Sequence, residues 1–338
     1  MKILVSGGAG FIGCKLVKKL LDEDFEVTVL DSLVFGGESL LSFYDNPRFE
    51  LVRGSILDRK KVEEALIGCD GVIHLAALVF IGDGKLSKFV DEVNYGGTKI
   101  VAEESINAGI KNFLFTSTCS NYGKTSCIVD EDSTLNPTNA YAMSKVKAEK
   151  YLLSTEVKDQ LNPLILRLST VFGLSPRMRF DLIVNELCKQ ATVNKKLEIF
   201  NPTAWRPGIH IDDVTDLILK CCNIWSCNCI DGFRGHNVFN VGNDTLNYQK
   251  IQLCNIIKEK IPELEITEVK NADIRDYRVS FERVKKFLSF VPKRSLKQGV
   301  NQIVYALKSG VFLHPGDISY DNLKTYQLYY HDKWREEK

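Results

Sequence analysis

Short apolar runs alternate with longer amphipathic segments through the first half of this 338-residue chain. Between most of the apolar runs, apolar positions recur at helical spacing, as in 11–23, 60–68 and 96–109. The runs themselves are rich in valine, isoleucine, leucine and phenylalanine, and they predict strands at 2–6, 26–30, 49–53, 71–76, 112–117 and 164–169. This alternation is typical of the α/β class, with a doubly wound parallel sheet that helices cover on both faces.

The pattern changes after Phe172, where a proline-bearing loop leads into a new helical segment. The apolar–polar run 208–222 has the character of a segment that returns to the sheet layer. A single hydrophobic core rarely serves a chain longer than about 300 residues. We therefore expect a large domain at 1–172 with a returning segment near 207–242. A smaller α/β domain would then consist of 173–206 and 243–338.

The first predicted strand runs directly into the loop GGAGFIG, residues 7–13, which opens the first predicted helix. A glycine triplet in this strand–loop–helix context is informative, because the loop lets backbone approach a pyrophosphate that the helix N-terminus then binds. The pattern predicts a Rossmann-type dinucleotide site whose loop residues are Gly7, Gly10, Phe11, Ile12 and Gly13.

Asp31 closes the second predicted strand. A carboxylate at this position accepts hydrogen bonds from the ribose hydroxyls of an adenosine and repels a 2′-phosphate. The alternative is an ordinary exposed aspartate in a turn. Together with the glycine loop, Asp31 predicts NAD rather than NADP as the cofactor.

Composition adds mainly exclusions. The 44 basic and 43 acidic side chains leave a formal net charge of +1, so no long-range field draws the chain to nucleic acid or to an anionic membrane. The few residues before the glycine loop are too short for a signal peptide, and no apolar run approaches the roughly 18 residues of a spanning helix.

Ten cysteines without a framework predict a reducing, cytoplasmic setting. The group Cys221, Cys222, Cys227 and Cys229 lacks the paired spacing of zinc ligands, so no metal site is expected.

Tyr141 and Lys145 are four residues apart in the predicted helix 140–152. Spacing alone does not distinguish a catalytic pair from a surface pair. The predicted strand 112–117 ends near Thr118, and carboxyl ends of parallel strands face the ligand crevice. Alcohol oxidation requires a base near neutral pH, so a tyrosine must be shifted by about three pKa units, and a lysine ammonium with a cationic nicotinamide favours that shift. We interpret the pair as catalytic, with Thr118 holding the substrate oxygen.

Several further motifs surround these residues: HLAA at 74–77, STCSNYG at 117–123, YAMSK at 141–145, LRLSTVFG at 166–173 and WRPGIHIDDV at 205–214. With the glycine loop and Asp31 they cover nearly the whole chain. On these motifs the chain resembles the extended short-chain dehydrogenase/reductase family of NAD-dependent sugar-nucleotide epimerases and dehydratases. The resemblance implies that Tyr141 is the base, Lys145 its lysine and Thr118 the catalytic hydroxyl. It also implies cofactor-side roles for Tyr141, Lys145, Ile56, Leu75, Ala76, Ala77 and Asn94, and substrate contacts for Thr118 and Thr170.

Two positions depart from the pattern of the family. Ser55 stands where relatives often have an aspartate that meets adenine, which weakens that contact without excluding it. Cys119 and Ser120 stand where 4,6-dehydratases have an Asp-Glu pair, and neither replacement is an acid–base group near neutral pH. A dehydratase (a lyase) and a non-catalytic NAD-binding regulator remain alternatives to an epimerase or dehydrogenase.

The segments 172–187 and 273–280 narrow the resemblance to a subgroup that oxidises C4 of nucleotide-linked sugars, including GDP-heptose 4-dehydrogenases and epimerases of surface-glycan pathways. The implied partner is a nucleotide-diphosphate sugar. Guanidinium groups are well suited to bind a diphosphate. Asn185 matches an asparagine that relatives direct toward the diphosphate. The candidate anchors are Arg177, Arg179, Asn185, Arg206 and Arg275.

The helical segments 86–109 and 140–156 have apolar residues on more than one face. These residues exceed the single stripe that a helix needs to cover a sheet, and pairing about a two-fold axis would bury the excess. We therefore expect a homodimer, with a thick monomer core as the alternative. The residues in question are Phe89, Val93, Ile100, Val101, Ala148, Leu152 and Leu153.

Overall fold

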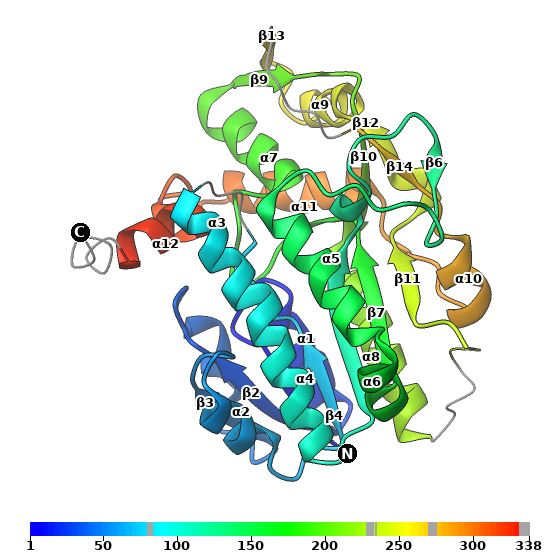
Figure 1. Cartoon of the computed structure of the whole chain (residues 1–338). Helices are drawn as coiled ribbons and strands as arrows, with labels where there is room; N and C mark the ends of the chain where they lie inside the picture. The colour runs from blue at the N-terminus through cyan, green and yellow to red at the C-terminus, as the bar shows by residue number, and fades with distance from the viewer. Residues whose placement is uncertain (80–83, 228–232, 234, 270–275, 331–338) are drawn as a thin grey trace.

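A seven-stranded parallel sheet forms the centre of the larger part of the computed structural model (Figure 1). The structure describes residues 1–79, 84–227, 233, 235–269 and 276–330. The strand order is β3 (Phe49–Arg53), β2 (Glu26–Asp31), β1 (Lys2–Ser6), β4 (Gly71–His74), β5 (Asn112–Thr118), β7 (Pro163–Leu168) and β11 (Val238–Val241). The chain moves outward from β1 to β3 and then crosses back to β4. This order confirms the predicted doubly wound fold and places a crevice at the carboxyl ends of β1 and β4.

Helices cover both faces of this sheet because successive strand residues point to opposite sides. Ile3 and Val5 pack with α1 (Gly13–Asp22) and α8 (Ile211–Ser226) on one face. Leu4 packs on the other face with α2 (Arg59–Leu66), α4 (Gly97–Asn107), α5 (Ala140–Leu152) and α6 (Thr155–Leu161). The segment 207–242 therefore contributes a helix and a strand, α8 and β11, to the large sheet unit.

A second group of elements lies above the carboxyl edge of the sheet (Figure 1). Its three-stranded sheet has the order β12 (Asn247–Gln249), β10 (Trp205–His210) and β8 (Thr170–Phe172), and β9 (Lys196–Phe200) pairs with β13 (Glu265–Val269). These strands share an apolar core with α7 (Ile183–Asn194), α9 (Lys250–Lys258) and α11 (Leu296–Lys308). Remaining short elements include η1 (Glu38–Phe43), η3 (Cys119–Tyr122), β6 (Ile128–Val129), η5 (Asp244–Leu246), β14 (Arg278–Val279), α10 (Glu282–Leu288) and η6 (Ile318–Tyr320).

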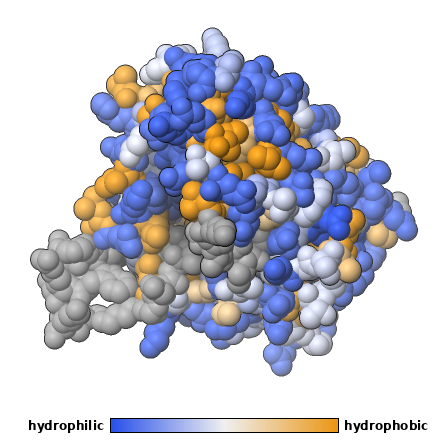
Figure 2. Space-filling model, turned by 90° about the horizontal axis from the view of Figure 1, so that it is seen from above, coloured by the Kyte–Doolittle hydropathy of each residue, from blue (hydrophilic) through white to orange (hydrophobic). Residues whose placement is uncertain are grey.

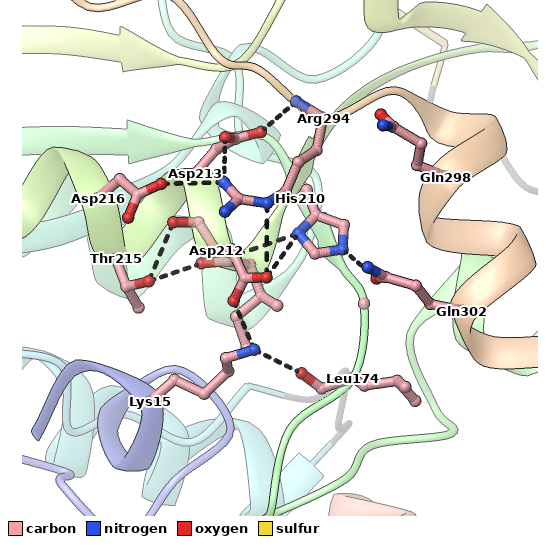
Figure 3. A network of polar contacts seen from close by, with 12 residues as sticks. Lys15, Leu174, His210, Asp212, Asp213, Thr215, Asp216, Arg294, Gln298 and Gln302 are labelled. Atoms are coloured by element: carbon pink, nitrogen blue, oxygen red, sulfur yellow. Dashed lines mark hydrogen bonds and ion pairs between the residues drawn. The ribbon is translucent and has the colours of Figure 1, made fainter. Parts of the chain in front are cut away.

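A polar network joins the two groups of elements (Figure 3). Lys15 of α1 pairs with Asp212 at the start of α8, at 2.5 Å, and donates to the Leu174 carbonyl. Arg294, just before α11, pairs with Asp213 at 2.7 Å and with Asp216 at 2.9 Å. Since these charges come from three separate helices and their flanks, the network fixes α11 against the large sheet unit.

The face seen from above is mostly hydrophilic, with apolar residues in small separate groups (Figure 2). Within the described part of the chain, no helix is long and apolar enough to cross a membrane.

Two histidines are buried without charge. His74 bonds Ser6 Oγ through Nδ1 at 2.6 Å and Thr98 Oγ1 through Nε2 at 3.0 Å, and burial lowers its pKa to about 3. His210 accepts the Asp212 N–H at its Nδ1 and bonds Gln302 Oε1 through Nε2, and burial lowers its pKa as well. In the folded chain His74 is therefore neutral, and His210 takes up a proton only at a lower pH than an unfolded histidine, which binds one below pH 6.5 or so.

We predict that the free energy of unfolding falls as the pH falls below about 6.5. The unfolded state then binds protons that the folded state excludes, which costs about 1.4 kcal/mol per pH unit for each fully buried neutral histidine. Urea unfolding between pH 7.5 and pH 5.5 measures this slope. His210→Asn should reduce the slope, and His314→Gln, at an exposed position, should leave it unchanged. Equal slopes for all three proteins would contradict the prediction.

Candidate active site

A cleft of ≈ 880 Å³ lies at the carboxyl edge of the parallel sheet, between it and the upper elements. It runs past the glycine loop, Asp31, the ends of β4 and β5, and the start of α5. Most predicted site residues line it: Gly7, Gly10, Phe11, Ile12, Gly13, Asp31, Ser55, Ile56, Leu75, Ala76, Ala77, Thr118, Tyr141, Lys145, Thr170, Arg179 and Arg206. Asn94 and Asn185 do not line it, and Arg275 lies outside the described residues.

The glycine loop is packed too tightly for other residues. Gly7 has φ +75°, and a Cβ there would lie 2.8 Å from the Ala76 backbone. At Gly13 a Cβ would lie 2.2 Å from the Gly7 carbonyl oxygen, so α1 begins directly against the loop. The loop's N–H groups and the N-terminus of α1 therefore border the cleft, which fits the pyrophosphate of a dinucleotide.

Asp31 ends β2 and is held in one orientation by two backbone groups. Its Oδ2 accepts the Ala9 N–H at 3.0 Å and its Oδ1 accepts the Leu33 N–H at 2.9 Å. Burial raises the pKa of this carboxyl, and the two N–H groups and the charge of Arg177 oppose that rise. A carboxylate fixed at the mouth of the crevice fits the ribose of an adenosine.

Ser55 turns toward its own backbone, because its Oγ accepts the Leu57 N–H at 3.1 Å. It stays at the cleft wall beside Ile56, which packs against Gly97 so closely that a Cβ on that glycine would lie 2.4 Å from Ile56 Cδ1. Ser32, Ser55, Ile56 and Leu57 all line the cleft, so this stretch combines two hydroxyl-bearing residues with apolar ones.

Asn94 supports the cleft wall from behind. It lies in the π-turn η2 (Glu92–Gly96) and is 0% exposed. Its amide exchanges hydrogen bonds with both backbone groups of Leu78 and donates to Ser144 Oγ, which in turn donates to the Tyr141 carbonyl. The expected cofactor-side role of Asn94 is therefore indirect: it fixes the loop after β4 against the start of α5.

The three predicted catalytic residues meet at the end of β5. Thr118 is the last residue of β5, and its side chain favours the ionised form of Tyr141, which lowers the pKa of that phenol. Asn139 caps α5 by accepting the Ala142 N–H at 2.9 Å, which starts the helix one residue before Tyr141. Lys145 lies one turn further along α5, is 2% exposed, and donates to the Thr116 carbonyl at 2.8 Å. Its Nζ also lies 4.4 Å from the centre of the Phe115 ring.

The sequence predicts that Lys145 lowers the pKa of Tyr141, but in the structure other groups have this effect. Burial raises the pKa of Tyr141 to about 12, and the groups that oppose this rise are Arg179 and Thr118. Burial lowers the pKa of Lys145 to about 7, against the charge of Glu149. The sequence motifs do not reveal that Arg179 is a cation that acts on the phenol.

A buried ion pair holds this helix in place. Glu149, one turn beyond Lys145, pairs with Arg167 of β7 at 2.7 Å, and the two side chains are 2% and 6% exposed. Glu149 also accepts from Ser117 Oγ and from Asn121 Nδ2. Ser117 is the residue between Thr116 and Thr118, so the same carboxylate orients the strand end that contacts Lys145 and Tyr141.

Cys119 and Ser120 supply no acid–base pair beside Thr118. Cys119 is 0% exposed and donates to the Arg167 carbonyl at 3.1 Å, and burial raises its pKa to about 12. Ser120 lies 3.4 Å from the Tyr277 hydroxyl. These two positions therefore hold a buried neutral thiol and a hydroxyl.

The arginines of the loop after β8 lie at different parts of the cleft. Arg177 lies over the Phe35 ring, 5.4 Å from its centre, on the side of Asp31. Arg179 is 8% exposed, forms a two-bond pair with Asp181 and lies near Tyr141. Asn185, by contrast, is 0% exposed and bonds the Gly173 N–H and the Arg179 carbonyl, so it shapes the loop and does not face a diphosphate.

Basic groups that sequence reasoning missed border the upper end of the cleft. Lys250, at the start of α9, is 4% exposed and donates to the Phe200 carbonyl at 2.9 Å. Lys189 of α7 lies 5.8 Å from the centre of the Phe180 ring. Both line the cleft with Arg206, which donates to the Trp205 carbonyl. No sequence motif marks these lysines, and only the fold brings them together.

The described residues contain no group of three or more potential metal ligands. Of the weighed cysteines, Cys221 and Cys222 are buried in α8, Cys227 is exposed, and Cys229 lies outside the described residues.

Residues 3–225 match the NAD dependent epimerase/dehydratase family, and the chain belongs to this family. It is therefore an enzyme of the extended short-chain dehydrogenase/reductase class, and NAD is the cofactor of that class. This confirms the family predicted from the sequence motifs.

Individual relatives differ in activity. The chain is 29% identical over 325 residues, 90% of this chain and 97% of the other, to the low-salt glycan biosynthesis protein Agl12 of Haloferax volcanii. It is 25% identical to the UDP-glucose 4-epimerase of Thermotoga maritima solved with UDP-glucose, at a TM-score of 0.78 and with 92% and 100% of the two chains covered. It is 26% identical to the UDP-glucuronic acid 4-epimerase of Bacillus cereus solved with NAD, at a TM-score of 0.78 and with 91% and 99% covered.

We predict that NAD binds at least about tenfold more tightly than NADP, because the Asp31 carboxylate and a 2′-phosphate repel at short range. Calorimetric titration of both cofactors measures the ratio. Asp31→Ala should weaken NAD binding and reduce the ratio between the NADP and NAD dissociation constants. Asp22→Ala, at an exposed position on α1, should change neither the NAD affinity nor this ratio. Comparable dissociation constants for NAD and NADP in the native protein would contradict the prediction.

Proposed function

We propose that the protein is an NAD-dependent nucleotide-sugar epimerase or dehydrogenase that removes hydride from C4 of the sugar. The observation that carries this proposal is the convergence of Thr118, Tyr141 and Lys145 at the end of β5, in the cleft that the glycine loop borders. Bound NAD accepts the hydride. The protein's own residues must orient the alcohol and remove its proton.

Tyr141 is the proposed base. The hydroxyl proton would pass to the Tyr141 oxygen as the carbonyl forms, and bound NAD would supply the acceptor for the C4 hydride. Thr118, whose side chain acts on the pKa of Tyr141, is placed to hold the same substrate oxygen. Because burial raises the pKa of Tyr141 to about 12, its phenolate needs compensating positive charge, which Arg179 supplies and a bound nicotinamide would increase.

The hydride can return to the other face of the sugar, which gives an epimer, or remain on the cofactor, which gives a net oxidation. The 4,6-dehydratase reaction is disfavoured by Cys119 and Ser120, which offer no acid–base pair at neutral pH. A role in surface-glycan synthesis is supported by the similarity to the glycan biosynthesis protein of Haloferax volcanii.

In this proposal the large unit, 1–172 with 207–242 apart from β8 and β10, binds NAD, and the smaller one, 173–206 with 243–338 together with those two strands, binds the nucleotide sugar. The solved UDP-glucose 4-epimerase, which holds UDP-glucose, supports a nucleotide-diphosphate sugar as the substrate. Arg206, Lys189 and Lys250 are the proposed diphosphate side of the cleft, since three cations border it there. A cytoplasmic location fits the free cysteines among the described residues, most of them buried.

The substrate panel is the direct experiment. UDP-, GDP-, CDP- and dTDP-sugars are incubated with the protein and NAD, and the products are analysed by mass spectrometry and NMR. Unchanged mass with an inverted C4 centre identifies an epimerase, and loss of two hydrogens identifies a dehydrogenase. Loss of water would identify a dehydratase and contradict the proposal. Tyr141→Phe should lower turnover at least about 10²-fold with NAD affinity nearly unchanged, and Thr118→Ala by about 10²-fold.

The homodimer remains a proposal, but the structure changes which residues support it. Val101, Ala148 and Leu152 are 0% exposed inside the chain's own core. Phe89 packs against the C-terminal helix α12 (Asn322–Tyr330). The outer faces of α4, α5 and the neighbouring η2 still carry partly exposed Tyr95, Ile100, Tyr151 and Leu153, and Met143 is 48% exposed.

These faces are the proposed two-fold interface, which would fix the helix that carries Tyr141. Light scattering at micromolar concentration should give close to twice the chain mass of 38.2 kDa. Met143→Lys, together with Ile100→Lys, should shift the protein toward the monomer, whereas Leu313→Lys, at an exposed position elsewhere, should not. A fully active monomer would refute the dimer and its support of the site.

A further inference from the structure

The C-terminal helix α12 forms a wall of the cleft although it is distant in sequence from every other wall. Asp321, Asn322, Leu323, Lys324 and Tyr326 all line the cleft. Figure 1 shows α12 beside the upper end of α3 (Gly84–Asp91), on the side where the carboxyl edge of the sheet opens. None of these residues belongs to a motif that the family resemblance uses.

Polar contacts attach the start of α12 to the arginine loop. Asn322 is 6% exposed, and its Oδ1 accepts from Arg177 Nη2 at 2.9 Å. Its backbone N–H donates to Asp181 Oδ2 at 3.3 Å, and the same carboxylate pairs with Arg179. Asn322 thus links, directly and through Asp181, the arginine near Asp31 and the arginine near Tyr141.

Apolar contacts attach the next turn of α12 to the cofactor side of the cleft. Tyr326 is 3% exposed, and its ring stacks on Phe89 of α3 with centroids 5.4 Å apart. The same cluster contains buried side chains from the loop after β4 and from α3. We call it the α12 cluster; it consists of Val34, Phe35, Leu78, Leu86, Phe89, Val90, Val93, Tyr141, Leu323 and Tyr326.

The α12 cluster reaches both proposed ends of the cofactor site. Val34 and Phe35 follow Asp31 by a few residues and line the cleft with it, and Tyr141 itself packs in the cluster. A dinucleotide held by Asp31 and by Tyr141 is therefore bordered by the cluster at both ends. α12 lines the same cleft and is held by its contacts with α3 and with the arginine loop.

We propose that α12 is a closing wall of the active site that slows the release of bound NAD(H). Tyr326 and Leu323 hold it against α3, and Asn322 is a positioning residue for the two cleft arginines. The inference rests on the proposed cofactor site. Slow release also matters for the course of the reaction, because an epimerase must retain the reduced cofactor between removal and return of the hydride.

The test measures NADH release directly. The protein is loaded with NADH, mixed with excess NAD, and the loss of bound-NADH fluorescence is followed by stopped flow. Tyr326→Ala should accelerate release about tenfold or more, because it removes a stacked aromatic pair from the closed state. Tyr326→Phe, which keeps the ring, should release near the native rate. Leu328→Ala, at a 66% exposed position on the same helix, is the matched control and should also behave as native.

Thermal unfolding shows whether each variant folds. Should Tyr326→Ala not fold, Asn322→Ala tests the same wall without touching the aromatic pair, and it should also accelerate release several-fold. Release at the native rate from the folded alanine variant overturns the proposal, as does equal acceleration by Leu328→Ala. No nucleotide sugar is present, so this result is independent of whether the C4 reaction itself is correct.

Discussion

The position of Tyr141, the proposed base, depends on the buried ion pair between Glu149 and Arg167. Both groups are almost inaccessible to water, so their charges are compensated only by each other and by the hydrogen bonds around them. Arg167 also bonds the Tyr122 hydroxyl and the Glu131 carbonyl, and Glu149 bonds Ser117 and Asn121. One pair thus joins α5 to β7 and to the end of β5. Removing a single partner of such a pair typically costs about 3–5 kcal/mol, because it leaves a charge buried alone.

The end of β5 contributes both to the group around Tyr141 and to the hydrogen-bond network that supports it. The carbonyl of Thr116 holds Lys145, and the hydroxyl of Thr118 meets Tyr141, while Ser117 between them faces the supporting carboxylate. The strand end therefore contributes the backbone carbonyl of Thr116 and the side chain of Thr118 to the group around Tyr141, and the hydroxyl of Ser117 to the supporting network. Asn94 extends the support on the cofactor side by joining Leu78 to Ser144.

Much of the large unit is predictable from local pattern. The six predicted strands all form, because short apolar runs between amphipathic segments have few other ways to bury their side chains, and the glycine loop is specific because Gly7 and Gly13 admit no side chain. Local pattern cannot show which polar side chain faces the cleft. Asn94 and Asn185 are buried in backbone contacts, and the lysines at 189 and 250 reach the cleft only through folding.

The apolar excess on α3 illustrates the same limit. The sequence shows that Phe89 needs a partner, and a second subunit is one way to supply it. The structure supplies Tyr326 of the same chain, more than two hundred residues later in the sequence. A periodicity argument identifies a face that must be covered, but it contains no information about a distant segment that covers it.

The central claim is that hydride leaves C4 of a nucleotide-linked sugar for NAD. The most direct measurement uses the sugar nucleotide accepted by the protein, labelled with deuterium at C4, in a single turnover that is quenched before completion. The account predicts deuterium on the nicotinamide of the reduced cofactor. It also predicts a primary isotope effect on the rate at which the reduced cofactor's absorbance at 340 nm appears. Deuterium that stays on the sugar carbon, or exchanges into solvent without reduction of the cofactor, would contradict it.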